Sequence, residues 1–383
     1  MQRIALLEGY LRQDPANMQL RGDLVDLLIQ AERLEGARTY AIEALRIAPG
    51  DLPFRYRLAV IDHHCGSLEA AAEGLTALID AGANSPSVRF ELARVKAAQG
   101  NFRDCAEILD NLSREPLPES LAADVALLHV RALHRVGDLQ LAILVAERFL
   151  QLQPDAHALA SALATLYVDA QRMDDAVRLF HGAERDRPLD SEMLAVGGFV
   201  ELDAANVPAA LRHFEESVAK SPNSGRGLLG LGLAHAATGD LKLAKSALAG
   251  ATRIMPTHLG SWHALAWMQL LDKEVDAAER SFNDALEQDR TFGDTYGGLA
   301  IIAALRGDRS HSEELIRTGR KLDRASLNVG MAVTLLQHRG AMNTNEFLES
   351  ALKMLHKHAL SQNKAMRASF EKLLSSRVPG RSS

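Results

Sequence analysis

Residues 262–285 read WHALAWMQLLDKEVDAAERSFNDA, and this stretch decides the fold. Its second half places Ala278, Phe282 and Ala285 at i, i+4 and i+7, the spacing of one face of an α-helix. Its first half is another apolar run that opens with Trp262, and polar residues separate the two halves. The stretch therefore predicts two helices joined by a short turn, with small residues that let the helices approach closely.

The spacing that contains Ala278 recurs along the chain, in steps of 34 residues with one step of 37. The series consists of Ala37, Ala71, Cys105, Ala142, Ala176, Ala210, Ala244, Ala278 and Ser312. Many members follow a turn signal by five residues, as at Gly66, Gly100, Gly137, Gly239 and Gly307, whereas Gln171 and Lys273 replace the glycine in two periods. Many precede a proline by twelve residues, namely Pro49, Pro154, Pro188, Pro222 and Pro256. Both signals end helices, so each period is a helical hairpin.

This spacing resembles the tetratricopeptide repeat, in which an aromatic residue and a Leu-Gly pair precede Ala-x3-Phe and a closing proline. The best match begins at Trp262, and Tyr296, Leu299 and Ala300 restart the pattern one period later. The resemblance implies an all-α, right-handed α-solenoid of about nine to ten 34-residue hairpins, with capping helices at both ends.

The N-terminus reads as half a repeat. One period before Ala37, the second-helix core positions fall on Leu7 and Tyr10, and the closing proline falls on Pro15. We therefore expect residues 1–15 to form an N-terminal capping helix.

The single longer step falls at residues 113–120, which contain Pro116 and Pro118. Two prolines predict a stiff, non-helical link. One interpretation is a hinge between an N-terminal array at 16–115 and a C-terminal array at 116–343. The alternative is an enlarged loop without functional motion.

The C-terminal pattern is weaker. Residues 325–358 fit a hairpin that turns at Gly340, and we expect 344–376 to hold the last repeat helix and a capping helix. The capping helix would carry the apolar stripe Met366, Phe370, Leu373 and Leu374. The polar tail at 377–383 is expected to be disordered.

Composition favours packed helices over other classes. Hydrophobic residues make up 47% of the chain, while aromatic residues make up only 5%. The net charge of −6 gives no general affinity for nucleic acid. The chain lacks an apolar run long enough to insert into a membrane. The apolar run near its N-terminus is too short for the core of a signal peptide. Its two cysteines are compatible with a reducing compartment. We therefore expect a cytoplasmic protein.

Chemical motifs give no sign of catalysis. Residues 239–246 come close to a phosphate-binding loop, but Ala244 belongs to the repeat series and no strand precedes it. The run His63-His64-Cys65 would need further ligands from elsewhere to bind zinc. We expect no catalytic, cofactor-binding or metal-binding residues, and hence no enzyme.

The family resemblance implies that the first helix of each hairpin lines a concave groove, with fixed positions facing it. In the N-terminal half these positions are basic and aromatic: Tyr56, Phe90, Arg94, Arg131 and Arg135. In the C-terminal half they are mostly apolar: Phe199, Leu229, Leu233, His263, Trp267 and Ile301. Trp267 is expected to be exposed in the groove, because Trp262 already fills the aromatic core position. The alternative for the apolar set is ordinary packing between helices.

These features predict a protein-interaction scaffold that holds a partner peptide or helix in its groove, for example in a bacterial multiprotein or secretion complex. The carboxylate clamp of chaperone-binding members is missing, because Gly22 and Asp26 occupy its first two positions. Two alternatives stay open. The protein could be a structural self-assembler that forms a homo-oligomer through its ends, or a regulatory subunit of a separate enzyme.

Overall fold

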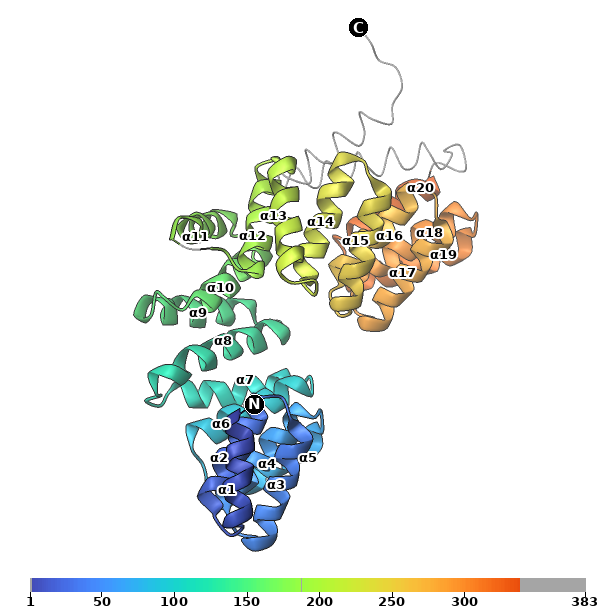
Figure 1. The fold of residues 1–383 in the computed structure, drawn as a ribbon. Helices are drawn as coiled ribbons and strands as arrows, with labels where there is room; N and C mark the ends of the chain where they lie inside the picture. Colours follow the sequence, from blue (N-terminus) through green and yellow to red (C-terminus); the bar gives the residue numbers. More distant parts are fainter. Residues whose placement is uncertain (1, 187, 338–383) are drawn as a thin grey trace. The chain divides into compact units, whose positions relative to one another are not determined.

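The computed structural model describes residues 2–186 and 188–337 (Figure 1). This described part contains twenty α-helices and no strand, which confirms the all-α prediction. Consecutive helices pack against each other as hairpins over most of the chain. The predicted turn at Gly340, the helices at 344–376 and the tail at 377–383 lie outside the described residues.

The helices alternate between two roles. The first helices of the hairpins are α2 (Met18–Gln30), α4 (Leu52–His64), α6 (Pro86–Ala98), α8 (Glu119–Arg135), α10 (His157–Asp169), α12 (Ser191–Asp203), α14 (Gly225–Thr238), α16 (Leu259–Leu271), α18 (Gly293–Leu305) and α20 (Leu327–Gln337). The second helices are α1 (Gln2–Gln13), α3 (Leu34–Ile47), α5 (Leu68–Asp80), α7 (Phe102–Ser113), α9 (Leu139–Leu152), α11 (Met173–Asp186), α13 (Val207–Lys220), α15 (Leu241–Ile254), α17 (Val275–Gln288) and α19 (Arg309–Leu322). Nine complete hairpins, α2 to α19, agree with the predicted repeat number.

The small-residue series lies in the buried contact between the two helices of every hairpin. All nine members, from Ala37 to Ser312, have no exposed surface. Ser312 takes the place of alanine because its hydroxyl donates a hydrogen bond to the carbonyl of Ala300 on the facing helix, at 2.8 Å. A buried hydroxyl with a partner avoids most of its desolvation cost. Cys105 fills its place as a small apolar side chain.

The turn inside each hairpin has one backbone conformation. The residue five before each series member has a positive φ in all nine hairpins. It is glycine in five of them, with φ between 77° and 86°. The other four are Glu32, Gln171, Ala205 and Lys273, with φ between 56° and 66°. The hairpin thus imposes the left-handed conformation even where the sequence lacks the residue that adopts it easily.

Glycines allow the phenylalanine at the centre of a hairpin to reach the neighbouring helices. Phe214 of α13 lies against Gly198 of α12 and Gly230 of α14. A Cβ atom would lie 2.4 Å from the Phe214 ring at Gly198 and 2.0 Å from it at Gly230. Phe282 contacts Gly298 in the same manner. The glycines of α14 therefore serve close packing.

The chain divides into two compact units, which we describe separately: a first unit at Met1–Leu166 and a second unit at Tyr167–Ser383. The boundary lies within α10. The predicted hinge at 113–120 instead falls inside the first unit, where α7 packs against α8. Part of the longer step extends α8, which begins at Glu119 and has 17 residues, so only the residues between Ser113 and Glu119 are non-helical. Motion at this link stays a prediction.

Helix α1 packs against the first unit through a different face from the one expected. Ile4 and Leu11 are buried, each 5% exposed, and Leu7 packs beside them. Tyr10 is 49% exposed, so its assignment to the core was wrong. Neighbouring residues on a helix point about 100° apart, and the contact at Leu11 turns Tyr10 toward solvent.

Candidate binding surface

In the first unit, side chains of successive first helices form a surface that we call the first-helix face. It comprises Asp26 of α2, Tyr56, Arg57 and His63 of α4, Phe90, Glu91 and Arg94 of α6, and Arg131 and Arg135 of α8. Successive first helices contact one another here, namely α2 with α4, α4 with α6, and α6 with α8. The five predicted groove residues of the N-terminal half lie on three successive first helices, α4, α6 and α8.

An ion pair joins α2 to α4 at one end of this face. Arg57 donates two hydrogen bonds to the Asp26 carboxylate, at 2.8 and 2.7 Å. These bonds raise the pKa of Arg57. Gly22 makes room for the pair, because a Cβ atom there would lie 3.1 Å from the Arg57 guanidinium. Gly22 and Asp26, which stand at the first two positions of a carboxylate clamp, therefore hold Arg57 of the same chain in place.

A buried carboxylate joins α4 to α6. Glu91 is only 4% exposed, and its two oxygens lie 2.6 Å from Nδ1 of His63 and 2.8 Å from Nη1 of Arg94. Burial and the Glu91 charge raise the pKa of the adjacent Tyr56. Glu91 uses only one Arg94 nitrogen, and the Arg94 side chain stays 41% exposed. Most of its five N–H groups can therefore still bind a partner.

Helix α8 adds cations to the face. Arg131 and Arg135 are exposed. The Arg135 guanidinium lies 4.9 Å from the centre of the Phe102 ring, a cation–π distance. Within the described residues, Arg135 forms no ion pair with a carboxylate. With the half-buried rings of Tyr56 and Phe90, the face offers aromatic surface beside cationic groups.

In the second unit, three of the six predicted groove residues are buried in the hydrophobic core, and Phe199, Leu233 and His263 are partly buried beside it. Leu229, Trp267 and Ile301 are 7%, 8% and 0% exposed and belong to one apolar cluster, against which Phe199 and Leu233 pack. The expectation that Trp267 is exposed was therefore wrong. The physical reason is the close approach of the helices, and ordinary inter-helix packing accounts for these residues.

His263 is the polar member of this region. Its Nε2 lies 2.9 Å from Oγ1 of Thr295, and its ring makes edge contacts with Phe282 and Phe292 at 5.3 and 5.4 Å. Burial lowers the pKa of His263 to about 4. The imidazole is therefore neutral at pH 7 and serves packing.

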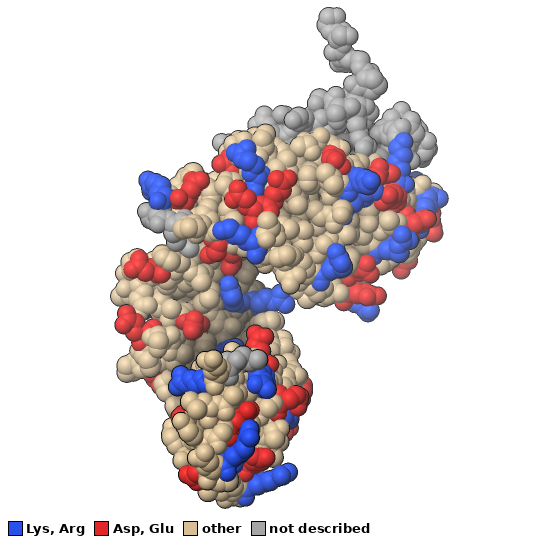
Figure 2. Space-filling view, viewed as in Figure 1, with Lys and Arg blue, Asp and Glu red and all other residues tan. Residues whose placement is uncertain are grey.

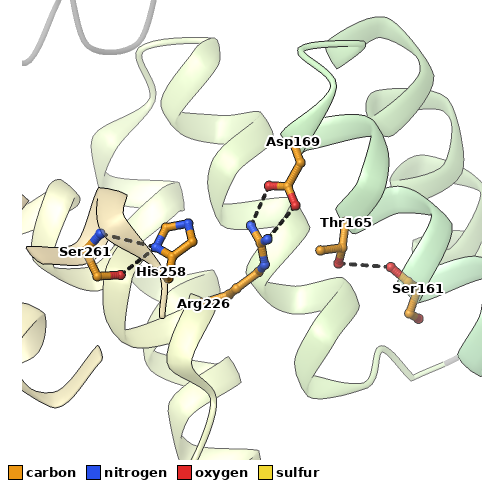
Figure 3. A network of polar contacts seen from close by, with 6 residues as sticks. All are labelled: Ser161, Thr165, Asp169, Arg226, His258 and Ser261. Carbon is orange, nitrogen blue, oxygen red and sulfur yellow. Dashed lines mark hydrogen bonds and ion pairs between the residues drawn. The ribbon is translucent and has the colours of Figure 1, made fainter. Parts of the chain in front are cut away.

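Sequence reasoning missed one inner ion pair of the second unit. Arg226 of α14 donates two hydrogen bonds to Asp169 of α10, at 2.7 and 2.5 Å (Figure 3). Arg226 is the second residue of α14 and Asp169 is the thirteenth residue of α10, and the sequence alone offered no reason to pair them. On α10 itself, the Thr165 hydroxyl donates to the carbonyl of Ser161.

The described residues offer few groups for other chemistry. They contain no cluster of three or more His, Cys, Asp or Glu side chains that could hold a metal ion. Burial raises the pKa of the Cys105 thiol to about 11. Over residues 2–186 and 188–337, no helix is sufficiently long and apolar to cross a membrane. On the face drawn in Figure 2, cationic and anionic side chains are interspersed.

Comparison with known proteins agrees with the repeat assignment. The family model of the tetratricopeptide repeat matches residues 90–157 and 200–258. No curated protein matches the chain. Among solved structures, a human IFIT1 dimer with m7Gppp-AAAA is 14% identical, with a TM-score of 0.59, and the match covers 94% of this chain and 90% of that chain. The IFIT1 monomeric mutant with Gppp-AAAA is 14% identical, with a TM-score of 0.58 and the same 94% and 90% coverage.

A tetratricopeptide repeat protein from Parabacteroides merdae is also 14% identical, with a TM-score of 0.45, and the match covers 66% of this chain and 98% of that chain. At these identities, the IFIT1 likeness concerns the fold alone.

Proposed function

We propose that this chain, in which the tetratricopeptide-repeat model matches residues 90–157 and 200–258, is a non-catalytic scaffold in the cytoplasm. It would bind a segment of a partner protein on the first-helix face of the first unit. Tyr56 and Phe90 would pack against apolar side chains of the segment. Arg94 and Arg135 would meet its acidic side chains. The partner would thus contact the N-terminal half, and not the apolar groove residues that the sequence predicts in the C-terminal half.

One observation carries this choice: the contrast between the two sets of first-helix residues. In the second unit, Leu229, Trp267 and Ile301 are at most 8% exposed and already pack against other parts of the chain. In the first unit, the Arg94 side chain is 41% exposed and Arg135 is also exposed. Aromatic and arginine side chains are the types that dominate binding energy at protein interfaces.

RNA is a weaker candidate for this face, although IFIT1 structures were solved with m7Gppp-AAAA and PPP-AAAA. Binding a phosphate chain depends on several cations that are not already neutralised. Here carboxylates hold Arg57 and contact Arg94, and the chain carries a net charge of −6. An acidic peptide needs fewer cations than a run of phosphates.

The test uses the full chain as bait, followed by affinity measurement with the purified partner. We expect the double variant Arg94→Ala, Arg135→Ala to bind at least about tenfold more weakly, because both guanidinium contacts are lost. Arg103→Ala is the matched control, because Arg103 is exposed on the second helix α7. Circular dichroism would check that all variants keep their helical content.

Equal binding by the double variant and the wild type would overturn the proposal. Light scattering on the same samples addresses self-assembly. Concentration-dependent oligomers with no captured partner would favour the structural self-assembler over the scaffold.

A further inference from the structure

A polar contact recurs at the fourth residue of the first helices. In four hairpins, this side chain donates a hydrogen bond to the backbone carbonyl six residues earlier. The pairs are Arg21 to Pro15 at 2.8 Å, Arg55 to Pro49 at 2.8 Å, Trp262 to Pro256 at 2.7 Å, and Tyr296 to Arg290 at 3.0 Å. In these four hairpins, a long or aromatic donor therefore covers the turn that precedes the first helix.

Several other first helices, such as α10 with Ala160 and α12 with Leu194, lack a donor at this position, and so does α14. The fourth residue of α14 is Leu228, which has no polar hydrogen to donate to the carbonyl of Pro222. A cavity of about 480 Å³ lies at this position. Its lining comes from the turn before α14, from α14 and from α15, and includes Pro222, Leu228, Leu231, Leu243, Arg253 and Ile254. The volume falls within the range of about 300–1,000 Å³ typical of ligand pockets.

The cavity is open to solvent, and its walls combine apolar and polar groups. Leu243 is 47% exposed and Ile254 is 37% exposed. Gly250 lets the Leu228 side chain pack closely on α15, since a Cβ atom there would lie 3.2 Å from Cδ1 of Leu228. Exposed apolar side chains gathered around a hollow mark a place where another group can be buried.

One cationic side chain lines the cavity. Arg253 is exposed there and forms no ion pair within the described residues. The Asp240 carboxylate lies near the opposite end of α15, where it accepts a hydrogen bond from the backbone N–H of Leu243. A partner that carries a carboxylate next to its apolar group would therefore complement this site.

We propose that this cavity is a second docking site, separate from the first-helix face, for a tryptophan or tyrosine of a partner protein that is followed by an acidic residue. The ring would lie on Leu228, Leu231 and Ile254 and would donate its N–H or O–H to the carbonyl of Pro222. The acidic residue would pair with Arg253. The partner thus supplies the group that Trp262 supplies within the next hairpin.

The first test measures binding of the blocked dipeptide acetyl-Trp-Glu-amide, labelled with fluorine on the indole, by ¹⁹F NMR. Competition by unlabelled acetyl-Leu-Glu-amide and acetyl-Trp-Lys-amide gives the preferences. We expect each competitor to bind at least about tenfold more weakly than acetyl-Trp-Glu-amide, because one lacks the ring and its donor, and the other has the wrong charge. Equal affinity of the three dipeptides would overturn the proposal.

The second test fills the cavity from within. Leu228→Trp should raise the melting temperature and abolish binding of acetyl-Trp-Glu-amide, because the new indole takes the place of the partner's ring. The control Leu152→Trp, at a residue that is 83% exposed on α9, should change neither quantity. Unchanged dipeptide binding by a folded Leu228→Trp variant would contradict the proposal.

A third variant keeps the proposal testable if Leu228→Trp fails to fold. Arg253→Glu changes an exposed residue and should leave the melting temperature unchanged. It should reverse the preference, so that acetyl-Trp-Lys-amide binds more tightly than acetyl-Trp-Glu-amide. A persistent preference for the glutamate dipeptide would place the binding elsewhere.

Discussion

At the scale of single residues, the turn position inside each hairpin shows that the repeat dictates backbone conformation. Lys273 has φ of 66°, although the left-handed region costs a residue with a Cβ atom roughly 1–2 kcal/mol. The sequence placed a turn here without its usual glycine, and the structure keeps the same turn. The packing of the surrounding hairpin therefore offsets the cost of the left-handed conformation at Lys273.

Relief of that strain should stabilise the chain. We expect Lys273→Gly to raise the free energy of unfolding by about 1 kcal/mol, measured by urea titration with circular dichroism. Gly239→Ala, at the equivalent turn with φ of 85°, should lower it by a similar amount. A destabilised Lys273→Gly variant would show that the conformation is not strained.

His263 makes stability depend on pH. Its pKa is about 4 in the folded chain, against 6.5 as its ordinary value, so folding favours the neutral ring. The neutral His263 ring contributes fully to the free energy of unfolding above pH 6.5. This contribution, up to about 3 kcal/mol, is lost as the pH falls toward 4. Urea midpoints at pH 7 and pH 4.5 should differ less for His263→Gln than for the wild type. Identical differences for the two proteins would contradict this role.

At the scale of helices and hairpins, the periodicity predicted which small residues lie buried between the two helices of each hairpin. Each repeat stacks on its neighbours through the same contacts, so these positions recur. It predicted the surface residues less well. Tyr10 is exposed and Trp267 is buried, against expectation, because their exposure depends on how neighbouring helices pack. Spacing along one helix does not contain that information.

The contact of Phe214 with two glycines gives a prediction for helix packing. Gly230→Ala should lower the free energy of unfolding by about 1–3 kcal/mol, because the new Cβ atom overlaps the Phe214 ring. Adding Phe214→Leu should restore part of the loss, measured by urea titration of the single and double variants. Gly182→Ala is the control, since no atom of a neighbouring residue lies within 4 Å of its Cβ position. Equal losses in the single and double variants would contradict steric overlap.

At the scale of the whole molecule, one repeated motif supports two different uses of its first helices. In the first unit, polar and aromatic side chains on these helices remain partly exposed, and ion pairs hold Arg57 and Arg94 in place. In the second unit, apolar side chains at the same positions contribute to the core. The sequence predicted the change from basic to apolar residues. It could not predict that the apolar half is packed internally, so the choice of binding surface depends on the structure.

The buried place of Cys105 within the alanine series gives the chain a built-in reporter of local opening. Its thiol has no exposed surface, whereas Cys65 is exposed. An alkylating reagent should therefore modify Cys65 at once and Cys105 only when the hairpin of α6 and α7 opens. The rate at the second site would measure how often this hairpin, which carries Phe90 and Arg94, separates under native conditions.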